Sequence, residues 1–201
     1  MTRFRAARVS CVLALLALAA VPGRAGGWSP SERIETYEIA GATGIELYRS
    51  IGERGPKIGF VRAIAYTTFD LKWARDYRPQ PDGACRLVSA RPRLVVITRL
   101  PRPAARLSGE IGRKWETFLS GIRTHEDYHA ETIVDMVKAI EAYSVGLTVA
   151  ADPKCRKIRE VLTRRLAELS QEQRARGRAF DEVEMGAGGN VHRLVLALIG
   201  E

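Results

Sequence analysis

The sequence predicts a single α+β domain in which a small, mostly antiparallel N-terminal sheet packs on a C-terminal antiparallel pair of long helices, a zincin-like arrangement. Residues 26–106 are rich in β-branched and aromatic residues, prolines and glycines, whereas residues from about 108 to 182 follow a helical period. A chain of 201 residues allows one well-packed domain but hardly two. We therefore expect one domain over residues 26–201, with its sheet part at about 34–106 and its helical part at about 108–201.

Residues 1–25 are expected to form a secretory signal peptide. Arginines precede an apolar run from Val9 to Val21, and small residues follow it at Ala25 and Gly26. The run is shorter than the ~20 residues of a membrane-spanning helix. We expect cleavage, no stable transmembrane anchor afterwards, and a periplasmic or secreted bacterial protein; an uncleaved anchor is the alternative.

The charge of the mature chain is modest. Cleavage after Ala25 removes four arginines and no acidic residue, so the formal net charge falls from +9 to +5. The chain has no zinc-finger spacing and no basic strand interleaved with aromatic residues. Nucleic acid is therefore not an expected partner.

The N-terminal half is predicted to contain short strands and one short helix. A strand is expected at residues 34–40, and Thr43 and Glu46 have the spacing of a capping box, which predicts a helix running to Ile51. Gly55-Pro56 is typical of a turn. Further strands are expected at residues 60–66, 68–73, 87–90 and 94–98, with breaks at the proline-rich loop 77–83, at Arg91-Pro92 and at Leu100 to Pro103.

The C-terminal half is predicted to be helical. In the first helix the apolar residues recur in steps of three and four along one face: Ile111, Trp115, Phe118, Leu119, Ile122, Ile133, Met136, Val137 and Ile140. Asp152-Pro153 is expected to begin a second helix that runs to about Phe180, with proline in its favoured first turn. Glycines at 186–189 separate it from a terminal helix at about 191–199.

Residues 125–129 read His-Glu-Asp-Tyr-His, the H-E-x-x-H pattern. Two histidines four residues apart on a helix can share one Zn²⁺, and Glu126 can act as the catalytic general base toward the water that the metal activates. The motif interrupts the apolar stripe for two turns, so it falls on the buried face. Burying such groups without partners costs about 1–3 kcal/mol each, and a metal supplies the partner. A polar core patch without metal is the alternative.

A zinc site of this kind needs a third protein ligand and one open position. His192 is the first candidate, because it follows the glycine cluster, where the chain can fold back. A surface histidine on the terminal helix is the alternative reading of that residue. Spacing does not choose among His192 and the other candidates: Glu184, Asp181, Glu168 and Glu172.

Two cysteines remain once Cys11 leaves with the signal peptide. Cys85 and Cys155 form an even pair in an exported protein, which favours one disulfide that closes a loop of about 70 residues. Two free thiols or metal ligands are the alternative.

The chain resembles domain-of-unknown-function family 922 (DUF922), a bacterial group described as predicted secreted zinc-dependent proteases. The residues that carry the resemblance are Tyr37, Gly41, Thr43, Leu47, Gly55-Pro56, Thr67 to Trp73, Cys85, Leu100-Pro101, Trp115, His125-Glu126 with His129, Cys155 and Phe180-Asp181. The resemblance agrees with the Cys85–Cys155 pairing. Family members commonly continue after the aspartate with a threonine and then a His-Gly pair, where this chain has Glu184 and Gly186-Ala187.

Together these features predict an exported zinc metallopeptidase that hydrolyses a peptide or protein substrate in the cell envelope. An edge strand of the sheet would hold the extended peptide. One alternative is a non-catalytic envelope protein that keeps a zinc or polar site for structure or binding. The other is a zinc amidohydrolase of the cell wall, which is compatible with the basic surface.

Overall fold

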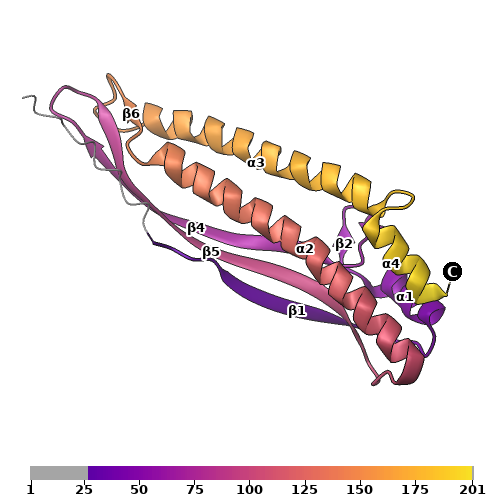
Figure 1. Ribbon diagram of the computed structural model, residues 1–201. Helices are drawn as coiled ribbons and strands as arrows, with labels where there is room; N and C mark the ends of the chain where they lie inside the picture. The colour runs from indigo at the N-terminus through magenta and orange to yellow at the C-terminus, as the bar shows by residue number, and fades with distance from the viewer. Residues whose placement is uncertain (1–26, 201) are drawn as a thin grey trace, which may run out of the picture.

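The computed structural model describes residues 27–200 and confirms the α+β class (Figure 1). The expected signal peptide lies outside the described residues. Within them, no helix combines the length and apolarity needed to cross a membrane. The elements in chain order are β1 (Ser31–Ile39), α1 (Gly44–Arg54), β2 (Lys57–Ile58), β3 (Val61–Arg62), β4 (Tyr66–Pro79), β5 (Cys85–Pro103), α2 (Gly109–Ser144), β6 (Thr148–Val149), α3 (Lys157–Met185) and α4 (Asn190–Ile199).

The main sheet has the order β1-β5-β4, with β6 paired to the start of β5. Strands β4 and β5 form a long antiparallel hairpin, β6 is antiparallel to β5, and β1 is parallel to β5. Figure 1 shows α2 lying along one face of this sheet, α3 running antiparallel beside α2, and α1 and α4 together at one end. The mostly antiparallel sheet and the antiparallel helix pair are thus both present.

Helix α1 begins as the capping box predicts. The Glu46 N–H donates to Thr43 Oγ1 over 3.3 Å, and the Thr43 N–H donates back to Glu46 Oε2 over 3.1 Å. These bonds satisfy two of the N–H groups that a helix start leaves free. The helix runs three residues beyond Ile51, to Arg54.

The strand breaks expected at Arg91-Pro92 and at Leu100 to Pro103 are wrong, since β5 runs through both. Its prolines lie at positions where no neighbouring strand would accept a hydrogen bond from their backbone nitrogen. The Ala104 N–H donates to Ile39 O in β1, so backbone alternation turns the nitrogens of Pro101 and Pro103 toward the β4 side, where pairing ends at Arg99. Pro92 faces the β1 side, but β1 pairs with β5 only from Val95 onward.

Two other boundaries also differ from the expectation. Residues 57–62 form the small β2–β3 hairpin, and β4 is one strand that continues through residues 77–79 of the expected loop. Helix α3 begins at Lys157, after Asp152-Pro153, because the Asp152 carboxylate accepts hydrogen bonds from the N–H groups of Arg156 (2.8 Å) and Ile158 (2.9 Å). Asp152 therefore caps the helix from outside it.

Three apolar clusters follow one another along α2. The first joins Trp115, Phe118 and Ile122 to α1, α4 and the end of β1. The second joins the stretch from Ile133 to Ile140 to β5 and to α3. The third surrounds the disulfide. The buried His125 and Glu126 of α2 lie between the first two clusters, in the interruption that the sequence shows.

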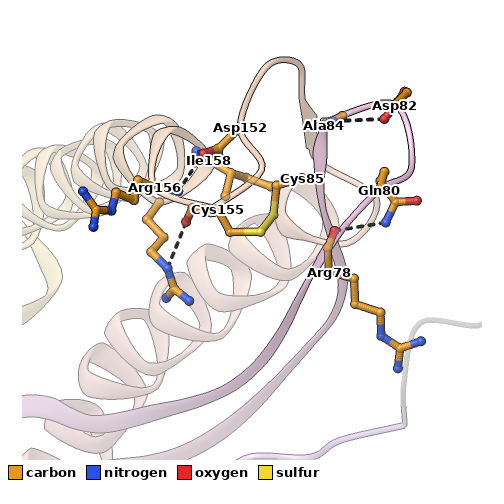
Figure 2. The surroundings of a disulfide bond; sticks show 10 residues. Arg78, Gln80, Asp82, Ala84, Cys85, Asp152, Cys155, Arg156 and Ile158 are labelled. Carbon is orange, nitrogen blue, oxygen red and sulfur yellow. Dashed lines mark hydrogen bonds between the residues drawn. A yellow bond between two sulfur atoms is a disulfide. The ribbon is translucent and has the colours of Figure 1, made fainter.

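The predicted disulfide is confirmed. Cys85 at the start of β5 is bonded to Cys155 in the turn before α3, with their Cα atoms 5.3 Å apart (Figure 2). Cys85 is completely buried against Leu87, Ile158 and Leu162. The bond joins the sheet to the start of α3 at the end of the molecule that also carries β6.

Candidate metal centre

Helix α2 holds the three residues of the H-E-x-x-H motif where its apolar stripe is interrupted. His125 and Glu126 are 3% and 5% exposed, so both are core residues despite their polarity. Spaced four residues apart, His125 and His129 project from one face, and their Nε2 atoms lie 3.2 Å apart. The motif therefore presents two imidazole nitrogens to one point.

Asp181 of α3 completes the convergence. Its Oδ1 lies 2.9 Å from His129 Nε2 and 3.2 Å from His125 Nε2. Because α3 runs antiparallel beside α2, a residue near its C-terminal end faces the middle of α2. Two nitrogens and one carboxylate oxygen thus lie within hydrogen-bonding distance of one another.

These three atoms fit a zinc ion. Ligands at Zn–N and Zn–O distances of 2.0–2.1 Å in a tetrahedron lie about 3.3 Å from one another, close to the three separations found here. Two atoms nearby are buried without a hydrogen-bond partner among residues 27–200, His125 Nδ1 and Glu126 Oε2. Buried polar atoms are rarely left without a partner, and a metal-bound water would provide one for Glu126 Oε2. His125 Nδ1 is the ring nitrogen turned away from the three converging atoms, and Glu184 Oε2 lies 3.7 Å from it.

Glu126 is placed to move a proton. Burial raises the pKa of its carboxyl, although the Thr67 hydroxyl and the two histidines act in the opposite direction. A general base works best when its pKa lies near the working pH, and this shift goes toward neutrality. Thr67 belongs to β4, so the sheet as well as the helices forms the surroundings of the carboxyl.

His129 and Asp181 perturb each other. Burial alone would lower the pKa of His129, but the hydrogen bond and charge of Asp181 outweigh it and raise that pKa. Burial alone would raise the pKa of Asp181, but hydrogen bonds from both histidines hold that pKa well below its ordinary value. Asp181 is therefore an anion at neutral pH, which is the form that binds a metal.

Two residues of α3 lie against the histidine rings. The Phe180 ring stacks on His125 with centroids 4.9 Å apart, and on Tyr128 with centroids 3.8 Å apart. At Gly177 the helix backbone faces the other ring: a Cβ built there would lie in contact with His129 Nδ1 at 3.4 Å, so a longer side chain would meet that ring. A glycine inside a helical pattern is the one sequence signal that could have indicated this contact; no signal singled out Thr67.

None of the other candidates for the third ligand reaches the Nε2 atoms of both histidines. The structure does not bring His192 to the pair, and its Nδ1 accepts a hydrogen bond from the Gly188 N–H (3.3 Å). Glu184 approaches the far nitrogen of His125, with Oε2 3.7 Å from Nδ1. Glu168 and Glu172 bind Arg165 on the exposed side of α3. Of the five candidate residues, Asp181 is the one that lies within hydrogen-bonding distance of both Nε2 atoms, because the alignment of α2 and α3 places it opposite them.

The side chains of the three converging atoms line a cavity of about 390 Å³. Ala65 and the first residues of β4, Tyr66 to Phe69, form one wall. The motif of α2 forms the floor, and a face of α3 from Ser170 to Met185 forms the other wall. Strand β4 is an edge of the main sheet, since β5 is its only partner among the described residues. An unpaired strand edge therefore runs beside the candidate metal centre.

A family model described as "Bacterial protein of unknown function (DUF922)" matches residues 34–189. The matched range includes the H-E-x-x-H motif, both cysteines of the disulfide and Asp181, and it ends before His192. The comparison with curated proteins gave no match. The comparison with solved structures gave none either.

Proposed function

The chain belongs to the DUF922 family of bacterial proteins, and from the geometry of its candidate metal centre we propose that it is an exported zinc-dependent peptidase. One observation carries the proposal: Nε2 of His125, Nε2 of His129 and Oδ1 of Asp181 converge within 3.2 Å beside the buried carboxyl of Glu126. Asp181 replaces His192 as the third ligand in this proposal.

In the proposed reaction His125, His129 and Asp181 would hold the metal, and Glu126 transfers protons as general base and then as general acid. Zinc, when bound, would activate water and polarise the scissile carbonyl. The Glu126 carboxylate accepts a proton from the attacking water and donates it to the leaving amine. The upward shift of its pKa favours the first of these steps, because it makes the carboxylate a stronger base.

The β4 edge is the proposed docking strand for the substrate. An extended peptide can pair with an unpaired strand edge through main-chain hydrogen bonds. Residues 65–69 line the cavity from this edge, so a peptide paired there would pass the three ligand atoms. The substrate class is a peptide or protein of the cell envelope; the amide bonds of cell-wall peptides belong to the same chemical class.

A non-catalytic role is favoured by one observation. The Asp181 carboxylate accepts a hydrogen bond from His129 Nε2 over 2.9 Å, so this contact partly satisfies the buried site without a metal. In that case the protein would be an envelope component that uses the site for structure or binding.

The test combines metal analysis with activity. We expect about one zinc per purified protein molecule, near-complete loss of zinc in Asp181→Ala, and retention in the matched control His192→Ala. Glu126→Gln should keep its zinc and lose at least 100-fold in peptide hydrolysis. Zinc retained by Asp181→Ala, or a wild-type protein that binds zinc but cleaves no peptide in a mixed-sequence pool, would overturn the proposal; the second result would favour the non-catalytic role.

A further inference from the structure

Two arginines of α3 line the same cavity as the candidate metal centre. Arg174 and Arg178 are one helical turn apart and lie on the face that also carries Gly177 and Asp181. The Arg174 guanidinium donates a hydrogen bond to Ser170 Oγ (2.6 Å), which orients it along the helix. In the described part of the chain, no carboxylate lies within 4.0 Å of either guanidinium.

The neighbouring arginines of the helix show the contrast. Arg176, between the two, points away from the cavity to Asp135, with 3.9 Å between Nη1 and Oδ2. Arg165 is paired with Glu168 at 2.8 Å. Like charges four residues apart on a helix destabilise it by a few tenths of a kcal/mol. Arg174 and Arg178 thus place two uncompensated positive charges on the cavity wall, which a bound anion would neutralise.

The charge of the loaded site leads to the same conclusion. Zinc carries two positive charges, which the carboxylates of Asp181 and Glu126 balance. The two arginines then leave the cavity with an excess of two positive charges. Planar guanidinium groups bind carboxylates through paired hydrogen bonds, so the complementary ligand group is a carboxylate.

We propose that Arg174 and Arg178 form a carboxylate-binding subsite, so that the protein selects peptides with a carboxylate close to the bond it cleaves. The inference rests on the proposed peptidase function and names its substrate class. Along the helix axis Arg178 lies about 4.5 Å and Arg174 about 10 Å from Asp181. An extended peptide advances about 3.3 Å per residue. The recognised carboxylate therefore lies one to three residues from the scissile bond.

Such a carboxylate has two sources, the C-terminus of the peptide or an acidic side chain. Three pools of acetylated tetrapeptides separate them. One pool has a free C-terminus and no Asp or Glu, the second is its C-terminal amide, and the third is an amide pool that contains Asp or Glu. Each pool is passed over zinc-loaded Glu126→Gln protein, and the retained peptides are quantified by mass spectrometry.

We expect the first or the third pool to be retained about tenfold better than the second, which identifies the source. When Arg174→Gln and Arg178→Gln are added together to the zinc-loaded Glu126→Gln protein, the preference should disappear. When the control Arg176→Gln is added instead, the preference should persist. Equal retention of all pools overturns the subsite. A preference that survives the double substitution also overturns it, because the metal itself would then bind the carboxylate.

Hydrolysis of the same pools by the wild-type zinc protein separates the two proposals. Cleavage without a preference for carboxylate-bearing peptides leaves the peptidase function standing and removes the subsite. Arginine-dependent retention without cleavage leaves the subsite standing and removes the peptidase function. Zinc content and the thermal unfolding midpoint of each arginine variant should equal those of the wild type, because both side chains are exposed.

Discussion

Replacing both cysteines of the disulfide, Cys85→Ala with Cys155→Ala, should destabilise the folded protein strongly. The bond spans 70 residues of chain. In the chain-entropy model, releasing a loop of that length costs about 4 kcal/mol of unfolding free energy. Alanine is preferred to serine because Cys85 is completely buried, and a hydroxyl there would add a desolvation cost of its own.

The magnitude translates into a measurable shift. For a chain of this size, about 4 kcal/mol corresponds to a fall of roughly 8–16 °C in the thermal midpoint. The assay is thermal or urea unfolding followed by circular dichroism, on the oxidised wild type and the double variant. The wild type in excess reductant is the matched control, and it should fall by a similar amount with no change in sequence.

A midpoint within about 2 °C of the wild type would refute the reasoning, since it would mean that the cross-link adds nothing to the packing of Leu87, Ile158 and Leu162 around it. The zinc content should not change. The start of α3 at Lys157 is about 36 Å along the helix axis from Asp181. Loss of zinc on reduction would show that the two ends of α3 are coupled.

Three further outcomes follow from the helices around the site. Gly177→Leu should weaken zinc binding at least tenfold, because its side chain would displace the His129 ring that a Cβ already contacts at 3.4 Å; zinc titration tests this, with Gly177→Ala as control, and equal affinities would contradict it. Glu184→Gln should lower zinc affinity about tenfold, because the carboxylate lies 3.7 Å from His125 Nδ1, where it can orient that ring; a competition titration that gives the wild-type affinity would exclude this role. Burial alone would raise the pKa of Asp152, but backbone N–H groups at the start of α3 hold it below 3.8, so its carboxylate stabilises the fold above about pH 4 and this stabilisation is lost as the pH falls further. The difference in urea midpoint between wild type and Asp152→Asn should therefore shrink from pH 6 to pH 3, and a constant difference would contradict the assignment.

The position of the motif in the core could be predicted because it depends on one helix alone. Apolar residues at steps of three and four define a single buried face, and His125 and Glu126 fall on that face. The capping box of α1 is local in the same way, since Thr43 and Glu46 are three residues apart. Both predictions needed only the geometry of one turn.

The acidic residue that faces the two histidines could not be chosen from the sequence, because it depends on how two helices are aligned. Asp181 and Glu184, like Glu168 and Glu172, are polar residues of α3 at helical spacing. The side chains that meet between α2 and α3 decide which of them faces the histidines, and no local pattern encodes that register. His192 is the first candidate from the sequence because the chain can fold back at the glycine cluster before it, but the structure does not bring its side chain to the two histidines.

The strand breaks were wrong for a related reason. A proline breaks a strand only where its missing N–H would have bonded to a neighbour. That depends on where β1 and β4 begin and end beside β5, which is decided by pairing over more than thirty residues of separation. The backbone nitrogens of Pro92, Pro101 and Pro103 each face a side of β5 where no neighbouring strand is paired, so these prolines do not break the strand.

Helix α3 is attached to the rest of the protein near both of its ends, by two different kinds of contact. Near its start a covalent bond holds it to the sheet, and near its other end Asp181 holds it to α2 through the histidines. With the proposed zinc bound, a chelator would weaken the second attachment and leave the first intact, whereas a reductant would do the reverse. The cavity wall that carries Arg174 and Arg178 lies close to the second attachment. If the proposed zinc binds there, its supply would control both the chemistry of the site and the rigidity of the wall beside it.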